Sequence, residues 1–213
     1  EALRLISAHG DTPAFLNYSP KGASRPFPAA LCVSINDEIV HGIPNEKERI
    51  LREGDIVSLD LGLKHKGFIT DSAVTVPVGA VDDESRDIMR LAREALEAGI
   101  KAAQPGAHVG DIGEAVHKVV KGTDYSLAED LAGHGVGFEV HEDPFVPNIG
   151  RKGEGEKLVP GMVIAIEPMV NAGDSAIADT DDGYTIVTAD GSRSAHFEHT
   201  IAITETGNIV LTR

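Results

Sequence analysis

Five residues of this 213-residue chain could together carry out metal chemistry, because each is an acid or a histidine among apolar or glycine neighbours. They are Asp60, Asp71, His134, Glu167 and Glu198. A carboxylate buried alone is costly to desolvate, and none of these segments has an adjacent Lys or Arg to offset its charge. Two divalent cations would balance four carboxylates, and an oxygen-rich set with one imidazole suits Mn, Fe, Co or Zn.

Taken singly, each residue has a simpler interpretation. A lone acid is more typical of an exposed or ion-paired strand end, and a lone histidine of a hydrogen-bonded structural residue. The metal hypothesis therefore depends on the whole set. It is favoured by position as well, since Asp60 ends an apolar stretch and Asp71 lies 11 residues later, on the expected return strand of the same hairpin.

The elements that must position these residues are mixed. Helical spacing of apolar residues predicts a long helix within 81–106 and a shorter one that begins near Asp111. Apolar, β-branched stretches at 55–61, 68–78, 162–166, 184–188 and 199–204 predict strands, with a turn at Gly67. Segments 19–28 and 148–155 are rich in Gly, Pro and Ser and are expected to be loops. Helices and hairpins in runs indicate an α+β fold.

A weak internal repeat suggests two related halves. Segment 53–60 resembles 160–167, 41–44 resembles 141–144, and 1–4 resembles 114–117, in the same order. The second half has the long helix at 81–105, for which the first half has no counterpart. We therefore expect a chain shortened at its N-terminus, in which the helix pair of the first half is largely absent.

Composition limits the class of protein. The length favours one domain, residues 1–213, and the formal net charge of −15 disfavours nucleic acid and anionic membrane as partners. A single cysteine, Cys32, excludes an internal disulfide and a cysteine-based zinc finger, and it fits a reducing compartment. No apolar stretch is long enough for a membrane span. We expect a cytoplasmic globular protein.

The ordered motifs resemble the methionine aminopeptidases, whose pita-bread fold joins two related halves through a curved antiparallel sheet with helices on its outer face. The resemblance runs from Phe15 to the C-terminus and rests on His41-Gly-Ile-Pro, Asp60, Asp71, Gly133-His134-Gly, His141-Glu-Asp-Pro, Glu167-Pro-Met and Glu198-His-Thr. Only 26 residues separate His141 from Glu167, so the long insertion of the type II branch is absent and type I is the closer match.

This resemblance implies a role for each residue. Asp60 would chelate one metal ion, Asp71 and Glu198 would bridge two, and His134 and Glu167 would complete the second. Glu167 would also be the general base that generates a metal-bound hydroxide. His41 and His141 would contact the scissile amide of the substrate, and one ion would bind its free α-amine.

The implied function is removal of the initiator methionine from nascent polypeptides with a small second residue. The methionine pocket would be lined by Phe15, Tyr18, Phe27, Cys32, Val140 and Tyr184, which are also compatible with plain core packing. An apolar, polarisable lining suits a thioether. Without a flanking base, Cys32 is expected in the pocket wall rather than as a nucleophile.

Some positions depart from the type I pattern. Val40 stands where Cys is common, Ile69-Thr70 precedes Asp71 in place of His-Gly, and 19–26 resembles an insertion. The segment 134–141 is closer to Xaa-Pro peptidases, so an Xaa-Pro dipeptidase or aminopeptidase is one alternative. A non-catalytic peptide- or ribosome-binding module of the same fold is another. Four more histidines are expected at the surface or in support of the ligands: His65, His108, His117 and His196.

The expected partners follow from the implied function. They are the N-terminal peptide of nascent chains and, as a further candidate, the ribosome. No direct contact with nucleic acid or membrane is expected, and we expect a monomer.

Overall fold

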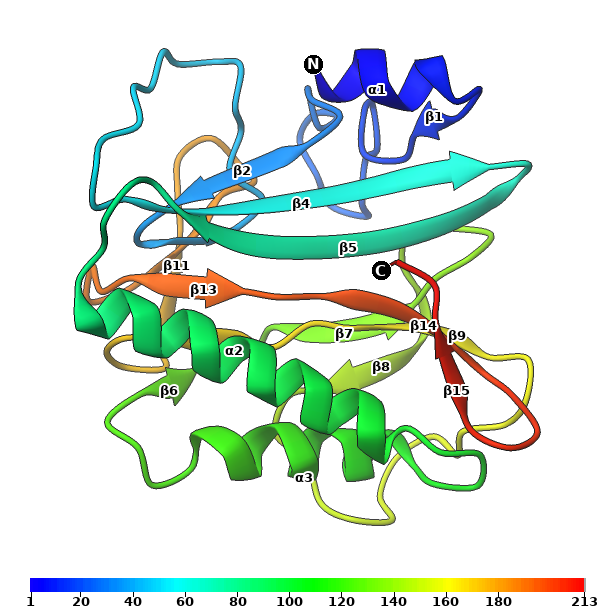
Figure 1. Cartoon of the computed structure of the whole chain (residues 1–213). Coiled ribbons are helices and arrows are strands. Elements are labelled where there is room, and N and C mark those ends of the chain that lie inside the picture. The colour runs from blue at the N-terminus through cyan, green and yellow to red at the C-terminus, as the bar shows by residue number, and fades with distance from the viewer. Residues whose placement is uncertain (213) are drawn as a thin grey trace.

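The structure is a computed structural model that describes residues 1–212 (Figure 1). Its helices are α1 (Ala2–Ala8), α2 (Asp83–Ala102) and α3 (Val109–Val120). The strands are β1 (Thr12–Pro13), β2 (Cys32–Ile35), β3 (Glu38–Val40), β4 (Ile56–His65), β5 (Phe68–Pro77), β6 (Ser126–Leu127), β7 (Ala132–Gly135), β8 (Glu142–Pro147), β9 (Val163–Ile166), β10 (Met169–Asn171), β11 (Ile177–Asp179), β12 (Ile186–Thr188), β13 (Ser194–His196), β14 (His199–Ile203) and β15 (Asn208–Val210).

Residues 1–212 form four antiparallel sheets. One sheet contains β1, β4 and β2 in that order, with β5 paired to β4, and another has the order β15-β14-β9-β7-β8. Of the two smaller sheets, β11-β12-β3 combines strands from both halves of the chain, whereas β13-β10-β6 lies within the second half. The predicted α+β class is therefore confirmed.

The longest ladder is the β4–β5 hairpin, which curves across the upper part of Figure 1. Its register runs from Ile56 opposite Pro77 to His65 opposite Phe68. The two turn residues, Lys66 and Gly67, both have positive φ (49° and 94°), the backbone geometry that matches the twist of a two-residue hairpin turn. This tight turn fixes the register on which Asp60 and Asp71 depend.

Helix α2 begins where its sequence can satisfy the free backbone N–H groups. The side chain of Asp82 accepts a hydrogen bond from Ser85 N at 2.9 Å, and Asp83 and Glu84 place negative charge in the first turn. The predicted long helix is thus confirmed. The shorter helix, α3, starts two residues before Asp111, whose carboxylate accepts from the backbone N–H of His108.

The main core lies between these two helices and the sheet of the second half, and Figure 1 shows α2 and α3 below the β4–β5 hairpin. A Cβ at Gly99 of α2 would lie 3.0 Å from side-chain carbons of both Ile166 and Val116, so glycine lets α2 approach β9 and α3 closely. Ile166 directly precedes Glu167. In residues 1–80 the structure describes one helix, α1.

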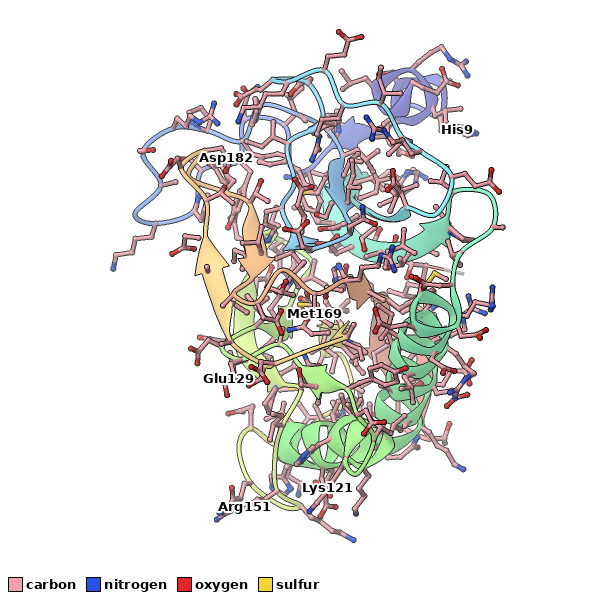
Figure 2. The ribbon with its side chains drawn as sticks, turned by 90° about the vertical axis from the view of Figure 1, so that its left-hand side faces the viewer. His9, Lys121, Glu129, Arg151, Met169 and Asp182 are labelled. Atoms are coloured by element: carbon pink, nitrogen blue, oxygen red, sulfur yellow. The ribbon has the colours of Figure 1, made fainter. Side chains whose placement is uncertain are left out.

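The loop around residues 19–28 and the β11–β12 hairpin lie against each other. Figure 2 shows the hairpin tip at Asp182 beside this loop, and Arg25 Nη2 donates to the Asp182 backbone oxygen at 2.9 Å. Met169, also labelled in Figure 2, is deep in the interior and 1% exposed. The molecule therefore surrounds its centre with segments that are distant in sequence.

Candidate metal centre

The β4–β5 hairpin places two carboxylates on one face. Asp60 pairs with Ala73, and Asp71 pairs with Gly62, so both side chains project to the same side of the sheet. Both are buried. The backbone of Asp71 is held from the opposite sheet, because its N–H donates to Thr200 Oγ1 at 2.8 Å and its carbonyl accepts from that hydroxyl at 2.7 Å.

Glu198 and Glu167 approach from the second half of the chain. Glu198, only 2% exposed, donates its backbone N–H to Ala73 O at 3.0 Å, which joins the segment before β14 to β5. Glu167 follows β9, and its carbonyl accepts from Asn148 Nδ2 at 3.1 Å. Two hydrogen-bonded sheets thus converge on one centre.

His134 depends on the glycines beside it. A Cβ at Gly133 would lie 2.2 Å from Ala165 O, so the sequence Gly-His-Gly lets β7 lie directly against β9. His134 Nδ1 hydrogen-bonds Gly135 O at 2.8 Å, and its Nε2 lies 3.4 Å from Glu167 Oε1. The imidazole is therefore held with Nε2 toward the carboxylates.

The electrostatics of this centre are those of a cation site. Burial raises the pKa of Asp71 and of Glu167 to about 7, and for Asp71 the charge of Glu167 adds to the effect. Burial and then neighbouring carboxylates raise the pKa values of Asp60 and Glu198 well above their usual range. Asp60 Oδ1 is buried and has no hydrogen-bond partner among the described residues. Such a cluster needs positive charge.

The donor set fits a divalent metal. Ligand atoms of Asp71, His134 and Glu198 all lie within 4.8 Å of one another. Asp60 and Glu167 line the same cavity as these three. Carboxylate oxygens with one imidazole nitrogen are ordinary ligands for first-row divalent ions. The structure thus brings together all five residues selected from the sequence.

The cavity that these carboxylates line has a volume of about 90 Å³. Its wall also includes Phe15, Tyr18, Phe27, Cys32, Val140 and Tyr184, all members of or packed against one apolar cluster. Cys32 pairs with Asp60 across β2 and β4, and burial followed by the charge of Asp60 raises the pKa of its thiol well above the usual value. The thiol is therefore protonated and a poor nucleophile.

His41 and His141 line the same cavity. His41 has φ of 60°, in the left-handed region, and a Cβ on the following Gly42 would lie 2.2 Å from Val33 O. The Tyr18 hydroxyl lies 2.7 Å from His141 Nδ1, and the rings of His141 and His134 are 4.4 Å apart. Burial lowers the pKa of both His41 and His141 to about 4, so both imidazoles are neutral at pH 7.

The other histidines divide into two groups. His65 is exposed beside Asp11, His108 caps α3, and His117 lies on α3. His196, by contrast, is 1% exposed, with Nε2 at 3.3 Å from Glu167 Oε2. The sequence predicts His196 only as a surface or supporting histidine. Its spacing of two from Glu198 would put both side chains on one face of an extended segment, but only the pairing of β13 with β10 brings the ring to Glu167.

Residues 6–205 match the family model "Metallopeptidase family M24". The chain belongs to this metallopeptidase family. Family membership makes it a metallopeptidase, and the carboxylate cluster described above is its candidate metal-binding group. No helix within residues 1–212 combines the length and the hydropathy that a bilayer crossing requires.

Several relatives of this M24 metallopeptidase are similar over nearly all of the chain. Methionine aminopeptidase 1 of Bacillus subtilis is 44% identical over 212 residues, which cover 100% of this chain and 82% of the relative. The methionine aminopeptidase of Aquifex aeolicus is 46% identical over 207 residues, or 95% of this chain and 79% of the relative.

Solved structures place the M24 chain in the pita-bread fold. The methionine aminopeptidase of Thermotoga maritima superposes with a TM-score of 0.93 at 44% identity, over 99% of this chain and 82% of that one. The prolidase of Pyrococcus furiosus superposes with a TM-score of 0.70 at 28% identity, over 90% of this chain and 51% of that one. The fold and the resemblance to methionine aminopeptidases that the sequence predicted are both confirmed.

Proposed function

We propose that this chain removes the N-terminal methionine from polypeptides whose second residue is small. The observation that carries the proposal is one cavity lined both by the carboxylate cluster and by side chains of an apolar cluster. Such a cavity can receive an apolar side chain while the adjacent amide meets the cluster. The names of the relatives from Bacillus subtilis and Aquifex aeolicus support the same activity.

Two divalent ions, Co, Mn, Fe or Zn, are the proposed cofactors. Asp60 would hold one ion, Asp71 and Glu198 both ions, and His134 and Glu167 the other. When bound, the ions would supply Lewis acidity at the scissile carbonyl and make water more acidic. Two such ions would also balance the four carboxylate charges that burial disfavours.

Glu167 and the two histidines have distinct proposed roles. With its pKa raised to about 7, Glu167 is matched to accept a proton from water near neutral pH. When the Tyr18 hydroxyl donates to Nδ1, neutral His141 keeps its hydrogen on Nε2 and can donate it to the scissile carbonyl oxygen. His41, on the same cavity, would contact the scissile amide or the residue after it.

The methionine side chain would lie against Phe15, Tyr18, Phe27, Cys32 and Tyr184. The Phe27 and Tyr184 rings meet edge to face at 5.2 Å, and the Tyr184 hydroxyl donates to the backbone oxygen of Arg25. These contacts preorganise the wall, so little side-chain entropy is lost when a substrate binds.

Two further parts of the proposal concern partners. Nascent chains are the proposed substrates, so the ribosome is a candidate partner, although a net charge of −15 disfavours direct contact with RNA. We also propose a monomer that acts as a single catalytic domain in the cytoplasm.

An Xaa-Pro peptidase is the second candidate, favoured by the segment 134–141 and by the structural similarity to the Pyrococcus furiosus prolidase. A non-catalytic binding module is disfavoured because all five candidate ligands lie at one centre.

A direct assay separates these candidates. The purified chain with Mn²⁺ or Co²⁺ is incubated with Met-Ala, Met-Leu and Ala-Pro peptides. We expect cleavage after methionine in the Met-Ala peptide only, since a narrow cavity rejects a bulky second residue more sharply than it rewards a small one. Preferential turnover of Ala-Pro would favour the prolidase candidate. No turnover of any peptide by the metal-loaded chain would favour the binding module.

A further inference from the structure

His196 is a buried titratable group that the proposed chemistry leaves without a role. Its side chain is 1% exposed, and neither ring nitrogen has a hydrogen-bond partner among the described residues. A buried imidazole with two unpaired nitrogens is costly, since each polar atom loses its hydrogen bonds to water. A buried histidine of this kind is expected to form a hydrogen bond with a nearby group once the metal site is occupied.

The backbone around His196 is held firmly in place. Its N–H donates to Thr75 Oγ1 at 2.8 Å, and its carbonyl accepts from the same hydroxyl at 2.9 Å. Ser58 Oγ lies 2.8 Å from that hydroxyl, so a chain of buried hydrogen bonds ties β13 to the β4–β5 hairpin. Across the β10–β13 ladder His196 pairs with Met169, two residues after Glu167. The backbone of His196 therefore holds the imidazole ring close to the carboxylate of Glu167.

Glu167 lies between two imidazoles. His196 Nε2 is 3.3 Å from its Oε2, and His134 Nε2 is 3.4 Å from its Oε1. Each carboxylate oxygen thus faces a different ring. Contacts of this length tighten when a site receives its ligand.

His196 differs from the candidate ligands in its surroundings. The ligand atoms that lie within 4.8 Å of one another belong to Asp71, His134 and Glu198. Among residues 1–212, His196 is not one of those that line the cavity. Of the five candidate ligands, Glu167 is the one whose side chain contacts the His196 ring within 4 Å. Glu167 is therefore the group through which we expect His196 to act.

We propose that His196 is a positioning residue for Glu167. Its Nε2–H donates to Oε2 and holds the carboxylate with Oε1 toward His134 and the cavity. This hydrogen bond would orient the carboxylate and leave Oε1 available to a cation. Removal of a residue that hydrogen-bonds to a metal ligand typically lowers metal affinity or activity by about 10- to 100-fold.

The inference concerns the same site as the proposed peptidase function and rests on it, but its first test needs no peptide. Metal affinity is measured by calorimetric titration of Mn²⁺ into the chelator-treated chain. The variants are His196→Gln, His196→Asn and His196→Leu, with His117→Gln on helix α3 as the control. Glutamine places an amide N–H at the reach of Nε2, asparagine places it only at the reach of Nδ1, and leucine has no donor.

We expect Mn²⁺ affinity to depend on a hydrogen-bond donor at the position of Nε2 and not on the size of the side chain. His196→Gln and His117→Gln retain Mn²⁺ affinity within about threefold of the unchanged chain, whereas the Asn and Leu variants lose about 10- to 100-fold. In the metal-free chain His196→Leu melts no lower, because it removes an unpaired buried polar group. With a Met-Ala peptide, the Asn and Leu variants lower kcat and leave KM nearly unchanged.

Other results would overturn the proposal. If His196→Leu retains both affinity and kcat, the ring has only a packing role. If glutamine restores no more affinity than asparagine, the hydrogen bond at Nε2 is not the cause. If the unchanged chain binds Mn²⁺ with the expected pattern among variants but cleaves no peptide, the peptidase proposal fails and the positioning role of His196 stands.

Discussion

Replacing Glu167 by glutamine should change stability with opposite signs in the absence and in the presence of metal. In the metal-free chain Glu167 is a buried carboxylate whose pKa burial raises from 4.5 to about 7. Glutamine keeps the shape and removes the charge. The variant therefore isolates the cost of ionising one group of the centre.

The sign follows from proton linkage. Between pH 4.5 and pH 7 the folded state keeps a proton on Glu167 that the unfolded state has lost, so its contribution to stability falls as the pH rises through this window. At about 1.4 kcal/mol per pH unit, the loss between pH 5 and pH 8 is about 2–3 kcal/mol. Without metal, Glu167→Gln should therefore gain about 2–3 kcal/mol over the unchanged chain across that interval.

Thermal unfolding of the chelator-treated chain at pH 5 and pH 8 measures this difference. For a chain of this size, 2–3 kcal/mol corresponds to about 5–10 °C in Tm. Buried histidines also titrate, but both chains contain them and their contributions largely cancel in the comparison. With excess Mn²⁺ the order should reverse, because a metal that binds only the folded state stabilises the chain with the better ligand more.

Glu97→Gln, on the exposed face of α2, is the matched control and should show the same difference in Tm from the unchanged chain with and without Mn²⁺. Burial does not raise the pKa of Glu167 if metal-free Glu167→Gln is less stable than the unchanged chain at pH 8, or if its relative stability does not depend on pH.

Three more predictions concern single residues. At saturating Mn²⁺, Glu167→Gln should lose about 10²- to 10⁴-fold in kcat on a Met-Ala peptide because the general base is gone; unaltered turnover would remove that role. Gly133→Ala should lower the free energy of unfolding by about 1–3 kcal/mol and weaken Mn²⁺ binding, because its Cβ would meet Ala165 O. Gly207→Ala, the control, should leave the free energy of unfolding nearly unchanged in denaturant titration. Equal effects of the two substitutions would argue against the close approach of β7 and β9. Asp82→Ala should lower the free energy of unfolding by about 1 kcal/mol because the cap of α2 is lost, whereas Asp82→Asn should keep most of that stability. Both variants should retain full kcat. An equal loss of stability in the two variants would show that the ion pair with Arg193, not the cap, stabilises the start of the helix.

The long elements could be predicted from sequence because their patterns are local. Helix α2 has its cap, its acidic first turn and its apolar spacing within twenty residues, and β4 and β5 are joined by a two-residue turn. The acids Asp60 and Asp71 could be selected for the same reason, as each interrupts an apolar stretch. These parts of the fold and the site require no knowledge of distant contacts.

The short strands could not be predicted in this way. Strands β3 and β6 have three residues or fewer and pair with β12 and β10, which lie more than forty residues away in sequence. Strand β8 contains two prolines, which disfavour a strand locally, yet Phe145 pairs with His134 in its ladder. Tertiary pairing decides these elements.

The same limit applied to His196. Its sequence neighbours indicate a buried extended segment, but only the β10–β13 ladder places its ring against Glu167. The turn at 179–182 is the reverse case. Asp182 accepts from the N–H groups of Tyr184 and Thr185 at 2.8 Å, so hydrogen bonds between near neighbours in sequence stabilise this turn.

The proposed function requires that the five selected side chains share a pair of cations. Anomalous diffraction from crystals of the chain grown with Mn²⁺ tests it most directly. We expect two peaks about 3.5–4 Å apart, enclosed by Asp60, Asp71, His134, Glu167 and Glu198. Peaks elsewhere on the surface, or no peak at this centre at saturating Mn²⁺, would contradict the claim.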